Sequence, residues 1–421
     1  MGTTNQRTQA VRKSLTAIFF LQGTLGTVMI PRVPELIHQI DVNFAAWGAI
    51  LGFSGLGALF GLMFANRYIV RFGSRQVLQA SSVLSALLLV TLPFITNAWV
   101  FFVIQAAMAF TGSCFNIALN MQAVVLQKIV NRTIIGKFHA GWSIGAASSA
   151  AISAVLATFL PLWLHFLIIP VPAAVILFIA STRTLTGEEI GKSSERKASK
   201  KAPFFKAPTQ LWLLAAGIFA GVFPEAAIMD WSAVFGKTVL GVDAGLSALP
   251  YTLFVGAMII SRLSLGRLTK NRHVGIISLW GGLFGSVAFG LGAFVGPVIA
   301  TQNPVAGLTF TATFWFVAGL GLGPMSPSFT SAAGNVKGLT TAQALSRMSL
   351  VSSLLFMGAK FVMGAIAQNV SLVAAFAMPT VLLLVAGLIS GVTAKRASKE
   401  KSAIEDAFPM TGPVGIIAVD N

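Results

Sequence analysis

The chain has 421 residues, of which 55% are hydrophobic and only 10% are charged, and its mean hydropathy is +0.82. This composition excludes an ordinary soluble protein and indicates an integral membrane protein whose main surroundings are the lipid bilayer. The net charge of +17 would suit a nucleic-acid partner only if the basic residues gathered on a soluble domain, and because the sequence shows no such domain we expect no nucleic acid.

Runs of apolar residues predict the architecture in chain order. Each run is about 20 residues long, the length that crosses a hydrocarbon core of about 30 Å. The sequence therefore predicts an all-α membrane protein with twelve transmembrane helices. The predicted spans centre on residues 14–36, 45–66, 76–96, 98–125, 138–159, 161–181, 209–235, 244–266, 274–297, 305–331, 344–367 and 370–394.

Basic residues predict the orientation, because Lys and Arg are retained on the cytoplasmic side of a membrane. With the N-terminus inside, nearly all of the 29 basic residues fall in segments that face the cytoplasm. The exceptions are Arg32, Lys237, Arg262 and Lys360. We therefore expect both termini in the cytoplasm and the protein in the cytoplasmic membrane.

The longest polar interval between spans is residues 182–208, which is rich in Lys, Ser and Glu. Such a composition favours a cytoplasmic linker over a packed domain. It divides an N-terminal half, residues 1–181, from a C-terminal half, residues 209–394, and a cytoplasmic tail follows at 395–421. We expect each half to contribute six helices and the protein to act as a monomer.

Two loops carry related patterns at the cytoplasmic end of the second helix of each half. The segments Gly61–Arg75 and Arg262–Arg272 both combine glycine with several basic residues. In this layout the chain resembles the major facilitator superfamily. The acidic residue usual in the first loop is replaced by Val70 or Asn66, depending on the alignment, which puts the family's usual gating salt bridge in doubt.

The resemblance implies two pseudo-symmetric six-helix halves, with helices 1, 4, 7 and 10 lining a central cavity. It also implies that basic residues near the two loops take part in gating, and these are Arg71, Arg75, Arg262 and Arg267. Within the superfamily, the segments Gly23–Pro34 and Glu225–Ser232 look most like the fucose-permease-like branch of bacterial carriers.

Two acids, Glu225 and Asp230, lie inside a long apolar span, where a carboxylate survives only with a partner or a function. Counting a straight helix at about 1.5 Å per residue places Glu225 level with Lys360, and Arg262 roughly 15 Å deeper. These depths allow a Glu225–Lys360 pair and disfavour a direct Glu225–Arg262 pair, and we expect Asp230 to be hydrated near the outer mouth. These charges either fix helix packing as compensated pairs or form a proton-coupling network of Glu225, Asp230 and Lys360.

Polar and aromatic side chains within the spans predict a binding site for a solute. Amides both donate and accept hydrogen bonds, and a ring face covers the C–H side of a sugar, so such a set suits a neutral polyhydroxylated solute. The alternative is that the amides only hydrogen-bond between helices. Together with Glu225, the candidate residues are Gln22, Asn116, Asn120, Trp142, Trp315 and Ser353.

Signatures of catalysis are missing from the sequence, including a nucleotide-binding glycine loop and a paired-histidine zinc motif. We therefore predict no enzymatic activity, no cofactor and no metal. The sequence favours a secondary active transporter that moves a small polar solute by alternating access, with the proton as coupling ion. The alternatives are an exporter of amphipathic compounds and a non-transporting membrane scaffold or sensor.

Overall fold

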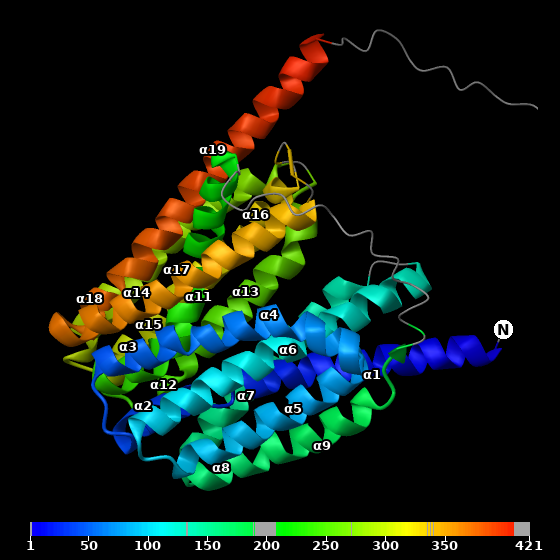
Figure 1. Ribbon diagram of the computed structural model, residues 1–421. Coiled ribbons are helices and arrows are strands. Elements are labelled where there is room, and N and C mark those ends of the chain that lie inside the picture. Colours follow the sequence, from blue (N-terminus) through cyan, green and yellow to red (C-terminus); the bar gives the residue numbers. More distant parts are fainter. Residues whose placement is uncertain are drawn as a thin grey trace, which may run out of the picture.

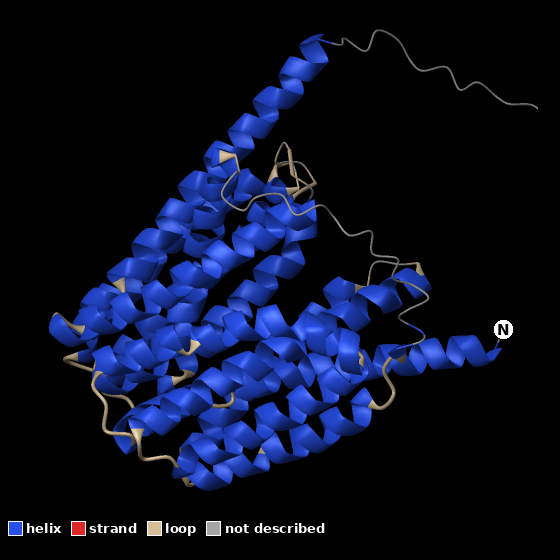
Figure 2. Cartoon of the chain, in the orientation of Figure 1, coloured by secondary structure: helices blue, strands red, loops and turns tan. Residues whose placement is uncertain are grey.

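The computed structural model describes residues 2–131, 134–187, 189, 208–270, 272–334, 336, 338, 339 and 341–407. Within these residues the regular structure is helical and no strand occurs, as Figure 2 shows. Twelve helical segments are long and apolar enough to cross a membrane, which confirms the predicted all-α, twelve-span architecture.

The helices of the N-terminal half form six spans, several of them built from two helices in succession. Their bounds are α1 (Gly2–Thr27), η1 (Ile30–Arg32), α2 (Val33–Gln39), α3 (Phe44–Phe53), α4 (Gly55–Phe72), α5 (Ser74–Thr91), η2 (Leu92–Phe94), α6 (Ala98–Val130), α7 (Ile135–Ala157), α8 (Leu162–Ile168) and α9 (Pro170–Ser181).

The helices of the C-terminal half repeat this plan after the linker. Their bounds are α11 (Thr209–Thr238), α12 (Ala244–Ser247), α13 (Leu249–Leu268), α14 (Val274–Ala300), α15 (Pro304–Leu322), α16 (Met325–Ala333), α17 (Thr341–Asn369), α18 (Leu372–Ala375) and α19 (Ala377–Ala407).

Local sequence signals explain where several helices begin and end. Asn43, Asn97 and Asn303 each stand just before an apolar run, and each side chain accepts a hydrogen bond from a backbone N–H of the first turn. Such caps satisfy donors that a helix start leaves unpaired. Gly73 separates α4 from α5 with φ +86°, a conformation that glycine adopts without steric cost.

Two of the predicted polar segments are described only in part. Residues 190–207 of the linker and 408–421 of the tail lie outside the described residues. The first part of the predicted tail is helical, because α19 continues from the last span to Ala407. The extension is rich in Ala, Lys and Glu, which favour helix.

The two halves form two bundles that converge at one side and diverge toward the other (Figure 1). The side of divergence carries the N-terminus, the ends of α9 and α13, and the beginning of α11. The side of convergence carries the turns near α2, α12 and α18. If the predicted orientation is right, the side of divergence faces the cytoplasm.

Glycine makes the close contact between the halves. A Cβ added to Gly48 on α3 would lie only 2.6 Å from the Cα of Gly364 on α17, so these helix backbones touch. One turn away, the backbone N–H of Phe44 donates to Gln368 Oε1 at 3.0 Å. The Phe44 ring also meets Trp231 of α11 edge-on, with 5.8 Å between ring centroids. These contacts close the side opposite the N-terminus.

Candidate functional site

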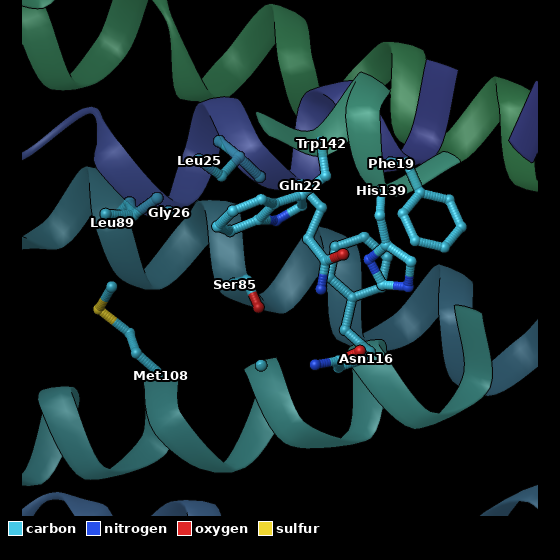
Figure 3. A pocket seen from close by; sticks show the side chains of 12 residues that line it. Phe19, Gln22, Leu25, Gly26, Ser85, Leu89, Met108, Asn116, His139 and Trp142 are labelled. Carbon is cyan, nitrogen blue, oxygen red and sulfur yellow. The ribbon is translucent and has the colours of Figure 1, made fainter. Parts of the chain in front are cut away.

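A cavity of about 420 Å³ lies against the N-terminal half. Four helices, α1, α5, α6 and α7, supply its walls. Figure 3 shows side chains reaching into it from α1 and α7 on one wall and from α6 on the facing wall. The lining residues are Phe19, Gln22, Leu25, Gly26, Ser85, Leu89, Met108, Gly112, Phe115, Asn116, His139 and Trp142.

Three residues predicted for the solute site come together here. In Figure 3 the Gln22 amide lies between the Trp142 indole and the His139 imidazole, and Asn116 approaches from the opposite wall. Because the rest of the lining is largely apolar, these groups are the natural points of recognition for a polar solute. Their role as a binding site remains a prediction.

Glycines explain why α1 and α7 bring Gln22 and Trp142 so close. A Cβ on Gly23 would overlap the backbone oxygen of Trp142, and a Cβ on Gly145 would overlap that of Phe20. The two backbones therefore pack in direct contact, as small residues allow in membrane helices. Gln22, which precedes Gly23, and Trp142, one turn before Gly145, project from this contact into the cavity.

A second cavity, of about 280 Å³, extends the first toward the closed side. The two share Gly26 and Met108 in their linings, so they are contiguous. The second cavity is lined from both halves, since it also reaches Asp230 and Lys360 of the C-terminal half. The two adjoining cavities thus bring the amides of the N-terminal half and a charged pair of the C-terminal half to the same region of the molecule.

The buried charges are paired differently from the sequence-based expectation. Lys360 Nζ lies 2.7 Å from Asp230 Oδ2, and the Asp230 side chain is only 7% exposed. Arg262 Nη2 lies 3.5 Å from Glu225 Oε2, and these side chains are 32% and 21% exposed. The depths counted from the sequence allowed a Glu225–Lys360 pair, which the structure does not form, and the predictions that Asp230 is hydrated and that Glu225 does not pair with Arg262 are wrong.

Helix ends and side-chain direction explain this correction. Counted from the observed helix ends, Asp230 lies eight residues before Thr238 and Lys360 nine before Asn369, so Asp230 rather than Glu225 is level with Lys360. Side chains also lean toward the N-terminus of their own helix. Because α11 and α13 run in opposite directions, Glu225 and Arg262 lean toward each other, and the long guanidinium side chain covers much of the remaining depth.

Other residues predicted for the solute site lie elsewhere. Trp315 is fully buried, and its indole N–H donates to Phe289 O at 3.1 Å within an aromatic cluster of the C-terminal half. Ser353 donates to Ser349 O of its own helix at 2.9 Å. Asn120 donates to Asn116 Oδ1, so it orients a cavity residue without lining the cavity itself. Membership of the tenth span predicted a cavity position for Trp315, but its side chain packs away from the cavity.

Two of the residues predicted for gating contact only their own half in the interactions that the structure shows. Arg75 donates to the backbone oxygen of Thr184, just after α9. Arg71 stacks over the Phe72 ring, with 5.2 Å from Cζ to the ring centroid. Arg267 is exposed at the end of α13. Arg262 differs, since it pairs with Glu225 and its charge also acts on His139 of the N-terminal half.

Hydrogen bonds and an ion pair hold the start of the linker against the N-terminal half. Arg7 donates to the backbone oxygens of Arg183 and Thr184, each at 2.8 Å, and forms an ion pair of 3.1 Å with Glu189. Burial by itself raises the pKa of Glu189, but hydrogen bonds from Arg7 and Thr186 outweigh it and hold the pKa below its usual range.

Sequence reasoning missed two polar features. His139 was not among the candidate residues, but it lines the cavity, and its spacing of three from Trp142 indicates that the two share a helix face. Sequence reasoning also missed a buried cluster in which Arg32 Nε donates to His165 Nδ1 at 2.9 Å and Nη1 donates to Glu35 at 2.8 Å. No pattern in the sequence joins residues so far apart. Within the described part of the chain, no cluster of His, Cys, Asp or Glu is suited to hold a metal ion.

Comparison with known sequences points to one family. A sequence model of the Major Facilitator Superfamily matches residues 15–338. An uncharacterized MFS-type transporter of Yersinia pestis is 26% identical over 382 residues, which cover 87% of this chain and 91% of the relative. An uncharacterized transporter of Sinorhizobium fredii is 26% identical over 302 residues, which cover 68% of this chain and 76% of the relative.

Solved structures share the fold. A crystal structure of a variant of the nucleoside transporter NupG matches with a TM-score of 0.70 at 12% identity, covering 92% of this chain and 99% of that one. A bacterial homologue of the human lysosomal transporter Spinster, in an inward-facing and unoccupied conformation, matches with a TM-score of 0.69 at 14% identity, covering 94% and 98%. The narrower fucose-permease-like resemblance is not tested by these matches and stays a prediction.

Proposed function

The chain belongs to the major facilitator superfamily, and we propose that it is a secondary active transporter that carries a small polar solute by alternating access. It is a multi-pass integral membrane protein of a transporter family. The proposal adds the kind of solute, the coupling ion and the membrane. We place the protein in the cytoplasmic membrane with both termini inside, from the distribution of its basic residues.

The observation that carries the proposal is the composition of the cavity. Gln22, Asn116, His139 and Trp142 gather in an otherwise apolar space that continues to the interface of the halves. Amides that donate and accept, next to an aromatic face, suit a neutral solute with several hydroxyl groups, such as a sugar. A cavity for amphipathic exports would need few such groups, so this composition favours the polar solute over the exporter.

We assign proton coupling to Glu225. Its pair with Arg262 is longer than the Asp230–Lys360 pair, and its side chain is 21% exposed against 7% for Asp230. A more exposed and more loosely paired carboxylate takes up a proton more easily than one held tightly in a buried pair. Neutralising Glu225 removes the carboxylate that pairs with Arg262 and so leaves the Arg262 charge without that partner.

Alternating access has a structural counterpart in the asymmetry of the two sides. The side opposite the N-terminus is closed by the Gly48–Gly364 contact and by Phe44, while the helices diverge at the other side (Figure 1). In the predicted orientation this is an inward-open state. A scaffold or sensor would not need amides in one half and a charged pair of the other half beside adjoining cavities.

Purified protein in proteoliposomes tests the proposal against a panel of labelled sugars, nucleosides, carboxylates and amphipathic drugs. We expect uptake of one polar class, and we expect Asn116→Ala to reduce that uptake at least about tenfold through the loss of solute hydrogen bonds. The control is Asn369→Ala, which removes an exposed amide outside the cavity that donates only within its own helix. Transport of amphipathic drugs alone would favour the exporter, and transport of nothing would favour the scaffold.

A further inference from the structure

A groove of about 800 Å³ runs along the outside of the N-terminal half. It is lined along α1 from Gln9 to Leu21, with Gly141 and Ile144 of α7 and Ile176 of α9 beside it. Helix α1 packs against both α7 and α9, so it forms the floor of the groove between them. The groove belongs to neither of the cavities described above.

The groove and the solute cavity lie on different faces of α1. Gln9, Lys13, Thr16 and Phe20 follow one another at spacings of four, three and four, which puts them on one face of the helix. The α1 residues that line the solute cavity are centred roughly a third of a turn away. Phe20, Ile144 and Ile176 are exposed, so this face looks toward the bilayer.

The lining of the groove changes from basic and polar side chains at one end to apolar side chains at the other. Its end near the N-terminus holds Arg12 and Lys13, both exposed, with the amide of Gln9 beside them. Farther along, the lining becomes apolar with Ala17, Phe20 and the α7 and α9 side chains. No carboxylate is among the described residues that line it, so the two cations have no acidic partner within the groove.

We propose that this groove binds an anionic phospholipid from the leaflet on the side of the termini. Arg12 and Lys13 hold the phosphate, and Gln9 donates to the headgroup. One acyl chain lies over Ala17 and Phe20. Basic sites between transmembrane helices at this depth are suited to anionic headgroups.

The length of the groove fits one leaflet. From Arg12 to Leu21 the helix rises about 14 Å, close to half of a hydrocarbon core of about 30 Å. A soluble anion would use the cations and leave the apolar part empty. The linker of this chain is itself rich in Lys, so its charge does not complement Arg12 and Lys13.

Native mass spectrometry of the full-length protein, released from nanodiscs of equal phosphatidylglycerol and phosphatidylcholine, tests the proposal. We expect about a thirtyfold preference for phosphatidylglycerol at one site, which corresponds to about 1 kcal/mol for each of two basic side chains. The double variant Arg12→Gln, Lys13→Gln should lose the preference. The matched control Lys270→Gln, Arg272→Gln removes the same two residue types from the exposed end of the other half and should keep it.

A second variant separates the acyl chain from the headgroup. Ala17→Trp fills the apolar part and leaves both cations, so it should release the lipid while the protein still folds and melts as the wild type does in detergent. Glycerol phosphate, which has the headgroup charge without acyl chains, should not compete. Equal retention of both lipids by the wild type, equal loss in the control double variant, or competition by glycerol phosphate would each overturn the proposal.

Discussion

The Asp230–Lys360 pair offers a quantitative test of the corrected charge pairing. Lys360→Met removes the cation that lies 2.7 Å from a carboxylate with a side chain only 7% exposed. Removing one partner of a buried pair costs about 3–5 kcal/mol, because the remaining charge is left without compensation. Since Lys360 itself is 21% exposed, we place Lys360→Met near 3 kcal/mol and Asp230→Asn near 2 kcal/mol.

The double variant Asp230→Asn, Lys360→Met should lose less than either single change, because it leaves no unpaired charge. Denaturant titration of the wild type, the two single variants and the double variant in one detergent measures their free energies of unfolding. These four values give the double-mutant cycle. We expect a coupling energy of at least about 2 kcal/mol. The assigned pairing would be refuted if the effects of the two single changes simply added. It would also be refuted if the coupling energy between Glu225 and Lys360 were larger than that between Asp230 and Lys360.

Three further predictions concern the contact between α3 and α17, the linker and the cavity. Gly364→Leu should reduce uptake at least about tenfold, because its side chain collides with the backbone of α3, whereas Gly358→Leu on the same helix has open space and should not. Glu189→Gln should lower the melting temperature at neutral pH. Because Arg7 lowers the pKa of Glu189, this difference should persist above the ordinary value of 4.5 and vanish as the pH falls below it; a pH-independent difference would contradict the pairing. Trp142→Ala should raise the apparent KM up to roughly tenfold with little change in melting temperature, and an unchanged KM would remove Trp142 from the site.

The architecture was predictable because the bilayer imposes a length and an apolar composition on every span. The pairing of charges was not, because only the observed ends of α11 and α17 show that Asp230 rather than Glu225 is level with Lys360. Straight-helix counting also follows the backbone, whereas Glu225 and Arg262 meet through side chains that lean toward each other.

The solute site was predictable in part. Gln22, Asn116 and Trp142 were found because polar and aromatic residues are rare within the spans. Trp315 was not separable from them, since a span that borders the cavity also has a face in the core, and only the packing of Phe289 against it decides which face it occupies. His139 was missed because it lies close to the predicted end of its span, where a polar residue is common.

We propose that the chain carries a polar solute together with protons and that Glu225 is the residue that takes up the proton. The most direct measurement compares two modes of transport in proteoliposomes that contain Glu225→Gln. Exchange of labelled for unlabelled solute needs no net proton movement, whereas accumulation driven by an imposed pH gradient does. If Glu225 couples solute movement to protons, the variant keeps exchange and loses accumulation. A variant that accumulates solute like the wild type, with the same pH dependence, would show that Glu225 is not the coupling residue.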